Sequence, residues 1–331
     1  MSSPRAVALS GGVGGAKLVL GLDRVLAPGE LLVVANTGDD FEHLGLHISP
    51  DIDTLLYTLS ERANTDTGWG RAGETWSFMS ALAELGQPVW FRLGDKDLAA
   101  HVLRTHHLRQ GNSLSQVTRE LARHYGIGTA VLPMSDDVVR TRVRTDAGWL
   151  DFQNYFVEKQ CAPAVRELCY DGAVVANPAP GVTSALHARG LDVICICPSN
   201  PYLSIDPILA VAGIRTALGQ AAAPIVAVSP IVGGQALKGP TARIMGDLGH
   251  RSSVVSIALH YRDVIDGLLI DECDRVYAGS IEKLGVEVHV ARTIMRSLED
   301  RCELARQVLK FAARLRGPRQ EERSHVGAGA G

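Results

Sequence analysis

Short apolar runs rich in β-branched residues recur along the chain, and the segments between them carry apolar residues at helical spacing. The runs are RAVAL (5–9), ELLVVAN (30–36), PVWFRL (88–93), AVVANP (173–178), DVICICP (192–198), PIVAVSP (224–230) and GLLID (267–271). They are continuous rather than alternating, which is typical of parallel strands covered by helices on both faces. The pattern predicts an α/β fold with a Rossmann-like, three-layer parallel sheet.

One stretch departs from this rhythm. Residues 138–157 alternate Val with Arg or Thr around the turn DAG, which predicts an antiparallel hairpin. With the helical patterns before it, the hairpin predicts a smaller cap region at 95–170, inserted into a Rossmann-like core formed by 1–94 and 171–315. Residues 316–331 are charged and then glycine-rich, so we expect a disordered tail.

Composition restricts the class of partner. The 331 residues are 46% hydrophobic and 21% charged, and their net charge of -3 offers no basic surface for nucleic acid. No run approaches 18 apolar residues, and the first residues lack the features of a signal peptide. We therefore expect a cytoplasmic protein that acts on small molecules and binds neither nucleic acid nor membrane.

The first predicted strand leads into a glycine-rich turn and a helix, in the sequence RAVALSGGVGGAKLVL. This order places backbone N–H groups and a helix N-terminus at the carboxyl end of a strand, where anions bind. Leu18 follows Lys17, so the P-loop pattern fails, and the GxGxxG dinucleotide pattern fails as well. The candidate phosphate-binding residues are Gly11, Gly12, Gly14, Gly15 and Lys17. The alternative is a tight turn packed under a helix.

Acidic residues gather after the second predicted strand and at the start of the next helix. Asp39 and Asp40 belong to the first group, and Asp51 and Asp53 to the second. An acid in the first turn of a helix is favoured by the helix dipole, which alone would explain Asp51. Capping does not require the other three, and carboxylates beside a phosphate loop are suited to Mg²⁺. Polar loops after other predicted strands, such as PSN at 198–200, favour a site at the same edge, although each also fits a cap or turn.

Several longer blocks occur together in one order: SGGVGGAKL, NTGDD, SPDIDTLLYTL, GRAGETW, LGDKDLAAH, LPMSDD, FQNYFV, PSNPYLSI and SPIVGG. In this combination the chain resembles the CofD/FbiA family, the 2-phospho-L-lactate or phosphoenolpyruvate transferases of coenzyme F(420) biosynthesis. The resemblance extends over residues 5–312. It implies a Mg²⁺-dependent enzyme that uses a guanosine diphosphate ester of a three-carbon acid and the deazaflavin alcohol Fo. The ribityl hydroxyl of Fo attacks the phosphorus that bears the acid, and GMP leaves.

The resemblance also implies roles for particular residues. By motif, Asp53 and Arg92 are the expected contacts to Fo and the catalytic candidates. The magnesium candidates are Asp39, Asp40 and Asp51, and the guanosine phosphates would be held by the glycine loop, Ser199, Asn200 and Lys238. Trp76, Phe152 and Tyr155 are candidate walls for a flat ring, with core packing as the alternative.

Three questions stay open at the level of sequence. The transferred acid can be phospholactate, enolpyruvyl phosphate or a phosphoglycerate derivative, because no residue decides among them. A non-catalytic nucleotide-sugar-binding regulator of the YvcK type is the alternative function, and a nicotinamide dehydrogenase is a weaker one. A homodimer is expected from the resemblance and from the apolar run SSVVSIALHYRDVIDGLLI at 252–270.

Overall fold

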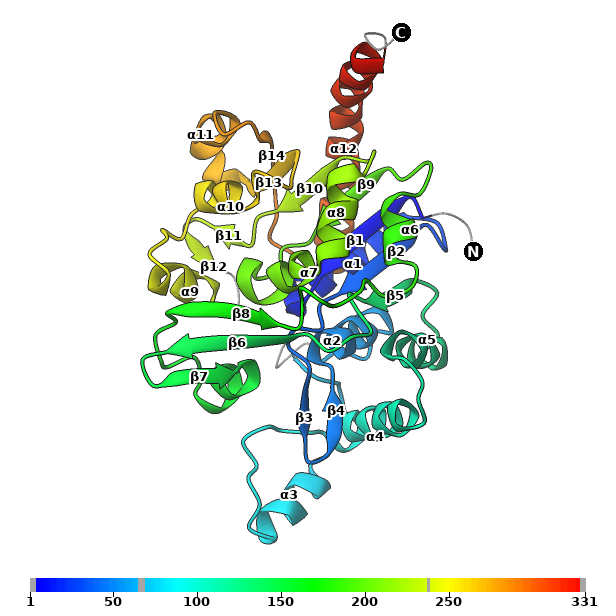
Figure 1. Ribbon diagram of the computed structural model, residues 1–331, viewed down its shortest axis with the longest axis vertical. Helices are drawn as coiled ribbons and strands as arrows, with labels where there is room; N and C mark the ends of the chain where they lie inside the picture. The colour runs from blue at the N-terminus through cyan, green and yellow to red at the C-terminus, as the bar shows by residue number, and fades with distance from the viewer. Residues whose placement is uncertain (1–3, 65–68, 237–238, 328–331) are drawn as a thin grey trace.

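A seven-stranded parallel sheet forms the centre of the molecule, in the order β14-β13-β10-β9-β1-β2-β5 (Figure 1). The computed structural model describes residues 4–64, 69–236 and 239–327. The strands of the sheet are β1 (Ala6–Ser10), β2 (Leu31–Ala35), β5 (Ala130–Pro133), β9 (Val193–Ile196), β10 (Ile225–Val228), β13 (Gly267–Asp271) and β14 (Glu287–Ala291).

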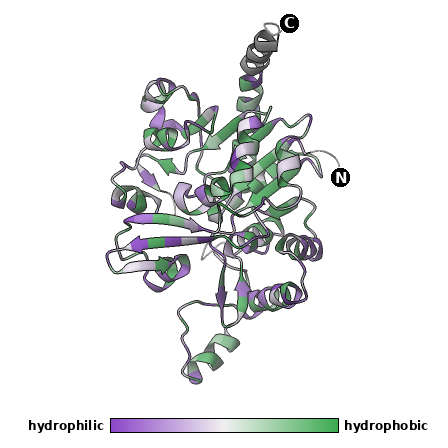
Figure 2. Ribbon diagram, viewed as in Figure 1, coloured by the Kyte–Doolittle hydropathy of each residue, from purple (hydrophilic) through white to green (hydrophobic). Residues whose placement is uncertain are grey.

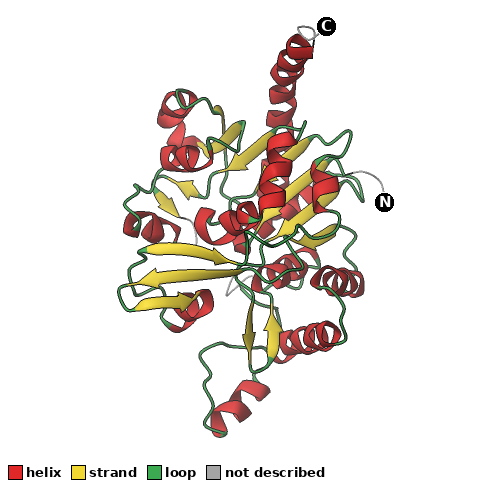
Figure 3. Cartoon of the chain, in the orientation of Figure 1, coloured by secondary structure: helices red, strands yellow, loops and turns green. Residues whose placement is uncertain are grey.

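Helices cover both faces of this sheet (Figure 3). One face carries α1 (Gly12–Val25), α2 (Pro50–Leu59), α5 (Leu114–His124) and α12 (Leu298–Gly327). The other carries α6 (Val182–Leu186), α7 (Asp206–Ala210), α8 (Ala212–Gln220), α10 (Val254–Tyr261) and α11 (Ala278–Glu282). The remaining helices are α3 (Ser77–Glu84), α4 (Asp95–Arg109), α9 (Thr241–Asp247), η1 (Asn154–Glu158), η2 (Pro201–Ile205) and η3 (Glu272–Tyr277).

Strand β1 shows why its continuous apolar sequence gives three layers. Successive side chains of a strand point to opposite faces. Ala6 and Ala8 pack with α1 and α12, whereas Val7 and Leu9 pack with the helices of the other face. All four side chains are fully buried, and the central strands are uniformly hydrophobic in Figure 2. The predicted three-layer Rossmann-like fold is confirmed.

The order of the strands fixes where a ligand can bind. From β1 the chain builds the sheet in one direction through β2 and β5, and later in the other direction through β9, β10, β13 and β14. Ser10 pairs with Ala35, and Leu9 pairs with Ile196, so the loops after β1, β2 and β9 begin at the same level. Ligands of open α/β sheets bind at this switch point, beyond the carboxyl ends of the strands.

Three smaller sheets are attached to the core. The predicted hairpin is confirmed as β6 (Arg140–Thr145) and β7 (Gly148–Asp151), and β8 (Glu167–Asp171) adds a third antiparallel strand. A second hairpin, β3 (Phe41–His43) and β4 (Leu46–Ile48), forms with α3 the extension at the bottom of Figure 1. The third pair is β11 (Ile231–Val232) and β12 (Gln235–Ala236).

Two of the predicted strands are wrong. Residues 88–93 form a loop, because their aromatic side chains pack on β3 instead of the sheet, with Phe91 edge-on to Phe41 at 4.8 Å. Residues 173–178 form a turn after β8 that leaves Val174 and Val175 more than 80% exposed. The sheet instead contains β5 and β14, which the sequence reading did not identify as strands.

The boundaries of the cap region and the tail also need correction. The predicted insertion at 95–170 contains β5, which pairs with β2 in the central sheet, so the insertion is not one separate unit. The tail expected to be disordered from residue 316 continues α12 as far as Gly327, in keeping with the good helix propensity of its Arg, Gln and Glu residues. Residues 328–331 lie outside the described part of the chain. The wider division into domains stays a prediction.

The apolar run at 252–270 belongs to the protein's own core. It forms α10 and β13, and its side chains Val254, Ile257, Ala258, Tyr261, Leu268, Leu269 and Ile270 are buried. The run therefore gives no support to a homodimer, which stays a prediction. Among the described helices, none combines the length and the apolar character needed to cross a bilayer.

Candidate active site

A cavity of about 1140 Å³ opens at the carboxyl edge of the sheet, at the switch point. Its walls come from the loops after β1, β2 and β9, from the first turns of α2 and from the segments around residues 90, 153 and 294. Pockets for one drug-sized ligand have volumes of roughly 300–1,000 Å³. This cavity lies just above the upper end of that range.

The glycine loop forms one wall of the cavity. Gly12 has a φ of +63°, which favours glycine, and a Cβ on Gly11 would lie 2.4 Å from a carboxylate oxygen of Asp51. Gly11, Gly12, Gly14 and Lys17 line the cavity, and the Lys17 Nζ donates to the carbonyl of Met295 at 3.3 Å. Gly15 lies behind the loop, where a Cβ would meet the hydroxyls of two serines at 2.4 Å. Both readings of the loop apply: it is a tight turn, and it faces a cavity.

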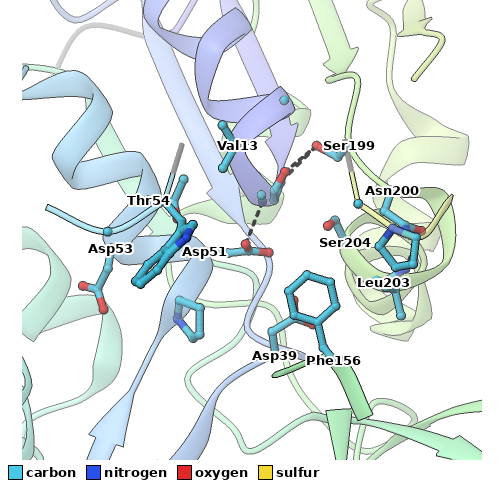
Figure 4. Close-up of a pocket in the computed structure, with 18 of the residues that line it drawn as sticks. Val13, Asp39, Asp51, Asp53, Thr54, Phe156, Ser199, Asn200, Leu203 and Ser204 are labelled. Atoms are coloured by element: carbon cyan, nitrogen blue, oxygen red, sulfur yellow. Dashed lines mark hydrogen bonds between the residues drawn. The ribbon is translucent and has the colours of Figure 1, made fainter. Parts of the chain in front are cut away.

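Asp51 is joined to the glycine loop and to the end of β2. Its Oδ1 accepts a hydrogen bond from the Gly12 N–H at 2.6 Å (Figure 4). Its Oδ2 accepts one from the Asn36 side-chain amide at 2.9 Å. The first turn of α2 thus contributes more than a helix cap. Burial raises the pKa of Asp51 to about 6, although these two hydrogen bonds lower it.

Asp39 lies beside Asp51 in the cavity wall (Figure 4). It is buried, and its Oδ1 has no hydrogen-bond partner among the described residues. Burial, and then the charge of Asp51, raise the pKa of Asp39 well above its usual value. Neither carboxylate pairs with a described lysine or arginine. Two adjacent buried carboxyl groups need either a proton or a cation between them, and a divalent cation fits this pair.

Asp40 lies near this pair, since its charge contributes to the raised pKa values of Asp39 and Asp51, but its own contacts differ. Its Oδ2 accepts hydrogen bonds from the Ser49 hydroxyl at 2.8 Å and from the His47 Nε2 at 3.1 Å, which tie the end of β2 to β4 and to the start of α2. Within the described residues, the cavity is lined by Asp39 and not by Asp40. These contacts favour a structural role for Asp40, but its Oδ1 is buried without a partner among the described residues, as that of Asp39 is, so its assignment as a metal ligand stays a prediction.

Asp53 lines another part of the cavity, and its carboxylate is directed away from Asp51 (Figure 4). Both of its oxygens accept hydrogen bonds from Arg104 on α4, from Nη2 to Oδ1 and from Nη1 to Oδ2, the second at 3.1 Å. The Arg104 side chain is completely buried. The negative charge of Asp53 is therefore compensated inside the protein, unlike that of Asp39.

Asp53, Asp97 and His101 present ligand atoms within 4.8 Å of one another, as a metal site would. The guanidinium of Arg104 already lies against this group, on Asp53 and 3.2 Å from the His101 Nδ1. A fixed positive charge there opposes a second cation. For a divalent cation, the pair Asp39 and Asp51 is therefore the better fit of the two groups.

Arg92 lines the cavity from the loop after α3, with its guanidinium 4.1 Å from the ring centre of Trp76. Two acids fix this loop. Glu74 accepts from the backbone N–H groups of Lys96 and Asp97 at the start of α4, and Asp95 accepts from those of Ser77 and Phe78 at the start of α3. The motifs GETW and LGDKD therefore cap each other's helices, and together they hold Arg92 in place.

The segment after β9 faces the glycine loop. The Ser199 hydroxyl donates to the Gly11 carbonyl at 2.7 Å, and the Asn200 side-chain oxygen accepts from the N–H groups of Tyr202 and Leu203. The Asn200 Nδ2 is buried without a partner among the described residues, so it is a donor available to a ligand. Ser199 and Asn200 both line the cavity. Lys238 lies outside the described residues.

Aromatic side chains form the remaining walls. Phe152 and Phe156 are stacked, with ring centres 5.2 Å apart, and Trp90 and Phe91 also line the cavity. Tyr155 is fully buried in the core, so its proposed role as a wall is wrong. The sequence reading missed Trp90, Phe91 and Phe156. The signal was present in PVWFRL and FQNYFV, but the first was interpreted as a strand.

The chain is similar to proteins of a known family. The family model described as "2-phospho-L-lactate transferase CofD" matches residues 6–299. A phosphoenolpyruvate transferase of Kitasatospora aureofaciens is 42% identical over 319 residues, covering 94% of this chain and 99% of the relative. A 2-phospho-L-lactate transferase of Methanococcoides burtonii is 38% identical over 309 residues, covering 93% and 100%.

Among solved structures, protein BH3568 of Bacillus halodurans superposes with a TM-score of 0.61, covering 93% of this chain and 100% of that one. That protein is described as a member of the UPF0052 family. Its sequence identity with this chain is 16%, so the likeness concerns the fold alone.

Proposed function

The chain belongs to the CofD family of 2-phospho-L-lactate transferases, and from this premise we propose its reaction. It transfers a phospho-three-carbon-acid group from a guanosine diphosphate ester to the ribityl hydroxyl of the deazaflavin Fo. The hydroxyl oxygen forms a bond to the phosphorus that bears the acid. The bond from that phosphorus to the bridging oxygen breaks, and GMP leaves.

The observation that carries the proposal is the uncompensated carboxylate pair of Asp39 and Asp51 beside the glycine loop, in a cavity of about 1140 Å³. Phosphoryl transfer requires neutralisation of phosphate charge and alignment of two oxygens, and little covalent work from the protein. Bound between Asp39, Asp51 and the phosphates, Mg²⁺ would supply that neutralisation. The unpartnered Oδ1 of Asp39 fits such a ligand role.

The guanosine diphosphate part of the donor is assigned to the glycine loop and to the segment after β9. The N-terminus of α1 directs its dipole at the cavity, and Lys17 adds a positive charge. The buried amide of Asn200 offers a further donor. The donor's acid is lactate, enolpyruvate or glycerate, and the assay of each ester described below distinguishes them.

Fo is assigned to the part of the cavity between Asp53, Arg92 and the aromatic side chains. Asp53 accepts the hydrogen bond of the attacking hydroxyl and thereby orients its oxygen toward the phosphorus. As a general base, Asp53 would accept the proton of that hydroxyl and pass it to water. Trp90 and Phe91 offer apolar surface to the ring.

The test is to mix the purified protein with Fo, Mg²⁺ and each of the three guanosine diphosphate esters, and to measure GMP release together with the deazaflavin product. We expect turnover with one ester in preference to the other two. Binding of the esters without GMP release from any of them would contradict the proposal and favour a nucleotide-binding regulator.

A further inference from the structure

We propose that Arg104 is a positioning residue for this transfer, and that it acts by holding the carboxylate of Asp53 in the orientation that receives the attacking hydroxyl. The inference rests on the proposed function. Arg104 does not line the cavity among the described residues, whereas Asp53 does. Its influence on the reaction must therefore pass through Asp53.

Arg104 lies in α4, and its contacts leave Asp53 little freedom. The planar guanidinium donates to both oxygens of the carboxylate, a fork geometry that fixes the plane of the acid as well as its position. Burial lowers the pKa of Arg104, but the charge of Asp53 and its hydrogen bonds raise it, so the guanidinium remains charged. A fully buried arginine is rare in proteins unless it is paired.

A second chain of contacts fixes the guanidinium itself. The Arg104 Nη1 lies 3.2 Å from the His101 Nδ1, and because arginine only donates, that ring nitrogen accepts. The ring proton is thereby placed on Nε2, which lies 3.2 Å from a carboxylate oxygen of Asp97. The other oxygen of Asp97 accepts from the Tyr57 hydroxyl at 2.5 Å. Tyr57 and Asp53 are both in α2, and Asp97, His101 and Arg104 are all in α4. The side-chain contacts therefore form a closed ring between the two helices.

This ring of side-chain contacts borders the cavity on one side. Tyr57, Asp97 and His101 line the cavity with Asp53, so this polar cluster is placed where a substrate can contact it. An ion pair that served stability alone would not need to lie at the cavity wall. Well-packed apolar residues can replace such a buried pair without loss of stability. Two of the four lone-pair directions of Asp53 are used by Arg104, which leaves the others for an alcohol.

Arg104 should therefore affect the orientation of Asp53 and not the binding of the guanosine ester. Without the fork, Asp53 can rotate, and a displacement of about 1 Å in a reacting group costs about 10²-fold in rate. The guanosine ester contacts a different wall of the cavity, so its affinity should not depend on Arg104.

A double-mutant cycle tests the proposal. The variants are Asp53→Asn, Arg104→Gln and the combined variant, in which two neutral amides replace the ion pair. For each variant, kcat and the KM values for Fo and for the preferred guanosine ester are measured at a temperature below the onset of its thermal unfolding. We expect each single variant to lower kcat/KM for Fo by about 10²-fold, and the combined variant by about the same amount instead of about 10⁴-fold. The KM for the ester should be unchanged.

Two further variants keep the test decisive. Arg104→Lys retains the charge without the fork, so it should fold and lose about tenfold in kcat/KM for Fo, between wild type and Arg104→Gln. The matched control is Arg109→Gln. Arg109 is an exposed arginine of the same helix that donates to the Gly45 carbonyl at 2.8 Å, and its replacement should leave the kinetics unchanged.

The outcomes separate this inference from the proposed function. A wild-type protein that does not turn over Fo overturns both. Two results with an active wild type would overturn the role of Arg104 alone. One is a loss of kcat/KM in the combined variant that equals the product of the two single losses. The other is an equal rise of the KM values for Fo and for the ester. Full activity of Arg104→Lys would do the same, because it would show that the fork geometry is not needed.

Discussion

Asp51 and Asp53 are two residues apart in the first turn of α2, yet their environments differ in one decisive respect. Two residues of an α-helix correspond to a rotation of about 200°, so the side chains leave the helix in nearly opposite directions. Asp51 faces the glycine loop and Asp39, without a described cation beside it. Asp53 faces α4, where Arg104 holds both of its oxygens.

The difference indicates which acids are left for a ligand to neutralise. The protein compensates the charge of Asp53 permanently, so this carboxylate can accept a hydrogen bond without a metal. It leaves Asp39 and Asp51 to share a proton or a cation. Their pKa values are raised because no positive charge of the protein compensates these two buried carboxyl groups. In the proposed reaction, one helix turn would supply an acid for metal binding and an acid for orientation of an alcohol.

The largest expected effect is on metal removal. Exhaustive chelation should abolish GMP release, and added Mg²⁺ should restore it, because the cation supplies several kcal/mol of charge stabilisation, about 10³-fold or more in rate. The measurement is the rate of GMP release in chelator and after titration with Mg²⁺. Undiminished turnover in chelator would show that Asp39 and Asp51 bind no cation in the reaction. The proposed difference between Asp51 and Asp53 would then be wrong.

The next prediction separates Asp39 from its neighbour in the chain. Asp39→Asn should raise the Mg²⁺ concentration for half-maximal rate by at least about 10–100-fold, the usual range for residues that support a metal. Asp40→Asn is the matched control, because it changes the same atoms in a residue bonded to Ser49 and His47. It should cost about 1 kcal/mol of stability and leave the Mg²⁺ requirement nearly unchanged. If both variants needed the same Mg²⁺ concentration for half-maximal rate, Asp40 would be a metal ligand as well.

A smaller effect is expected on the Fo side of the comparison. Trp76→Leu removes the ring beneath Arg92, a contact worth about 0.5–1 kcal/mol. The KM for Fo should rise by about two- to fivefold, with the Mg²⁺ requirement unchanged. Trp149→Leu, at a partly exposed tryptophan of β7, is the control and should leave the KM for Fo unchanged. A shift in the Mg²⁺ requirement of Trp76→Leu would show that the two regions are not independent.

The sequence was sufficient for the architecture and for one wall of the site. Continuous apolar strands and the glycine turn predict a three-layer sheet with a ligand at its carboxyl edge, since both follow from local pattern. The place of Asp39 was also predictable, because it follows a strand of the sheet that ends at that edge, whereas Asp51 follows the separate β3–β4 hairpin. The position of PVWFRL was not, because an apolar run of six residues has the same pattern in a strand and in a loop packed on aromatic side chains.

Long-range pairing was the part that the sequence could not supply. Arg104 is 51 residues from Asp53, and nothing in the local pattern of α4 distinguishes it from Arg109. This pairing changes the meaning of an Asp53→Asn substitution. A helix-start acid would cost about 0.3–1 kcal/mol, whereas breaking a buried ion pair costs about 3–5 kcal/mol. A loss of stability in that variant therefore does not argue against a role in the reaction.

The smallest expected effect is on the metal-free protein, and it tests the uncompensated pair without any substrate. Burial and the charge of Asp51 raise the pKa of Asp39 well above 3.8 in the folded state. The folded protein therefore binds the proton more tightly than the unfolded chain does. The stability that this carboxyl contributes is fully present below pH 3.8 and is lost as the pH rises through the raised pKa.

In chelator, the melting temperature of Asp39→Asn relative to wild type should therefore rise from about pH 4 upward, by about 2–4 °C for each kcal/mol of repulsion relieved. Because Asp51 lies beside Asp39, the difference between the two proteins reports the titration of the pair rather than of Asp39 alone. Added Mg²⁺ should stabilise wild type more than the variant, since a ligand that binds only the folded state raises its stability by mass action. Thermal unfolding from pH 4 to 8, with and without Mg²⁺, measures both effects. A difference that is constant with pH would mean that Asp39 is compensated after all, as Asp53 is, and the contrast between the two acids would disappear.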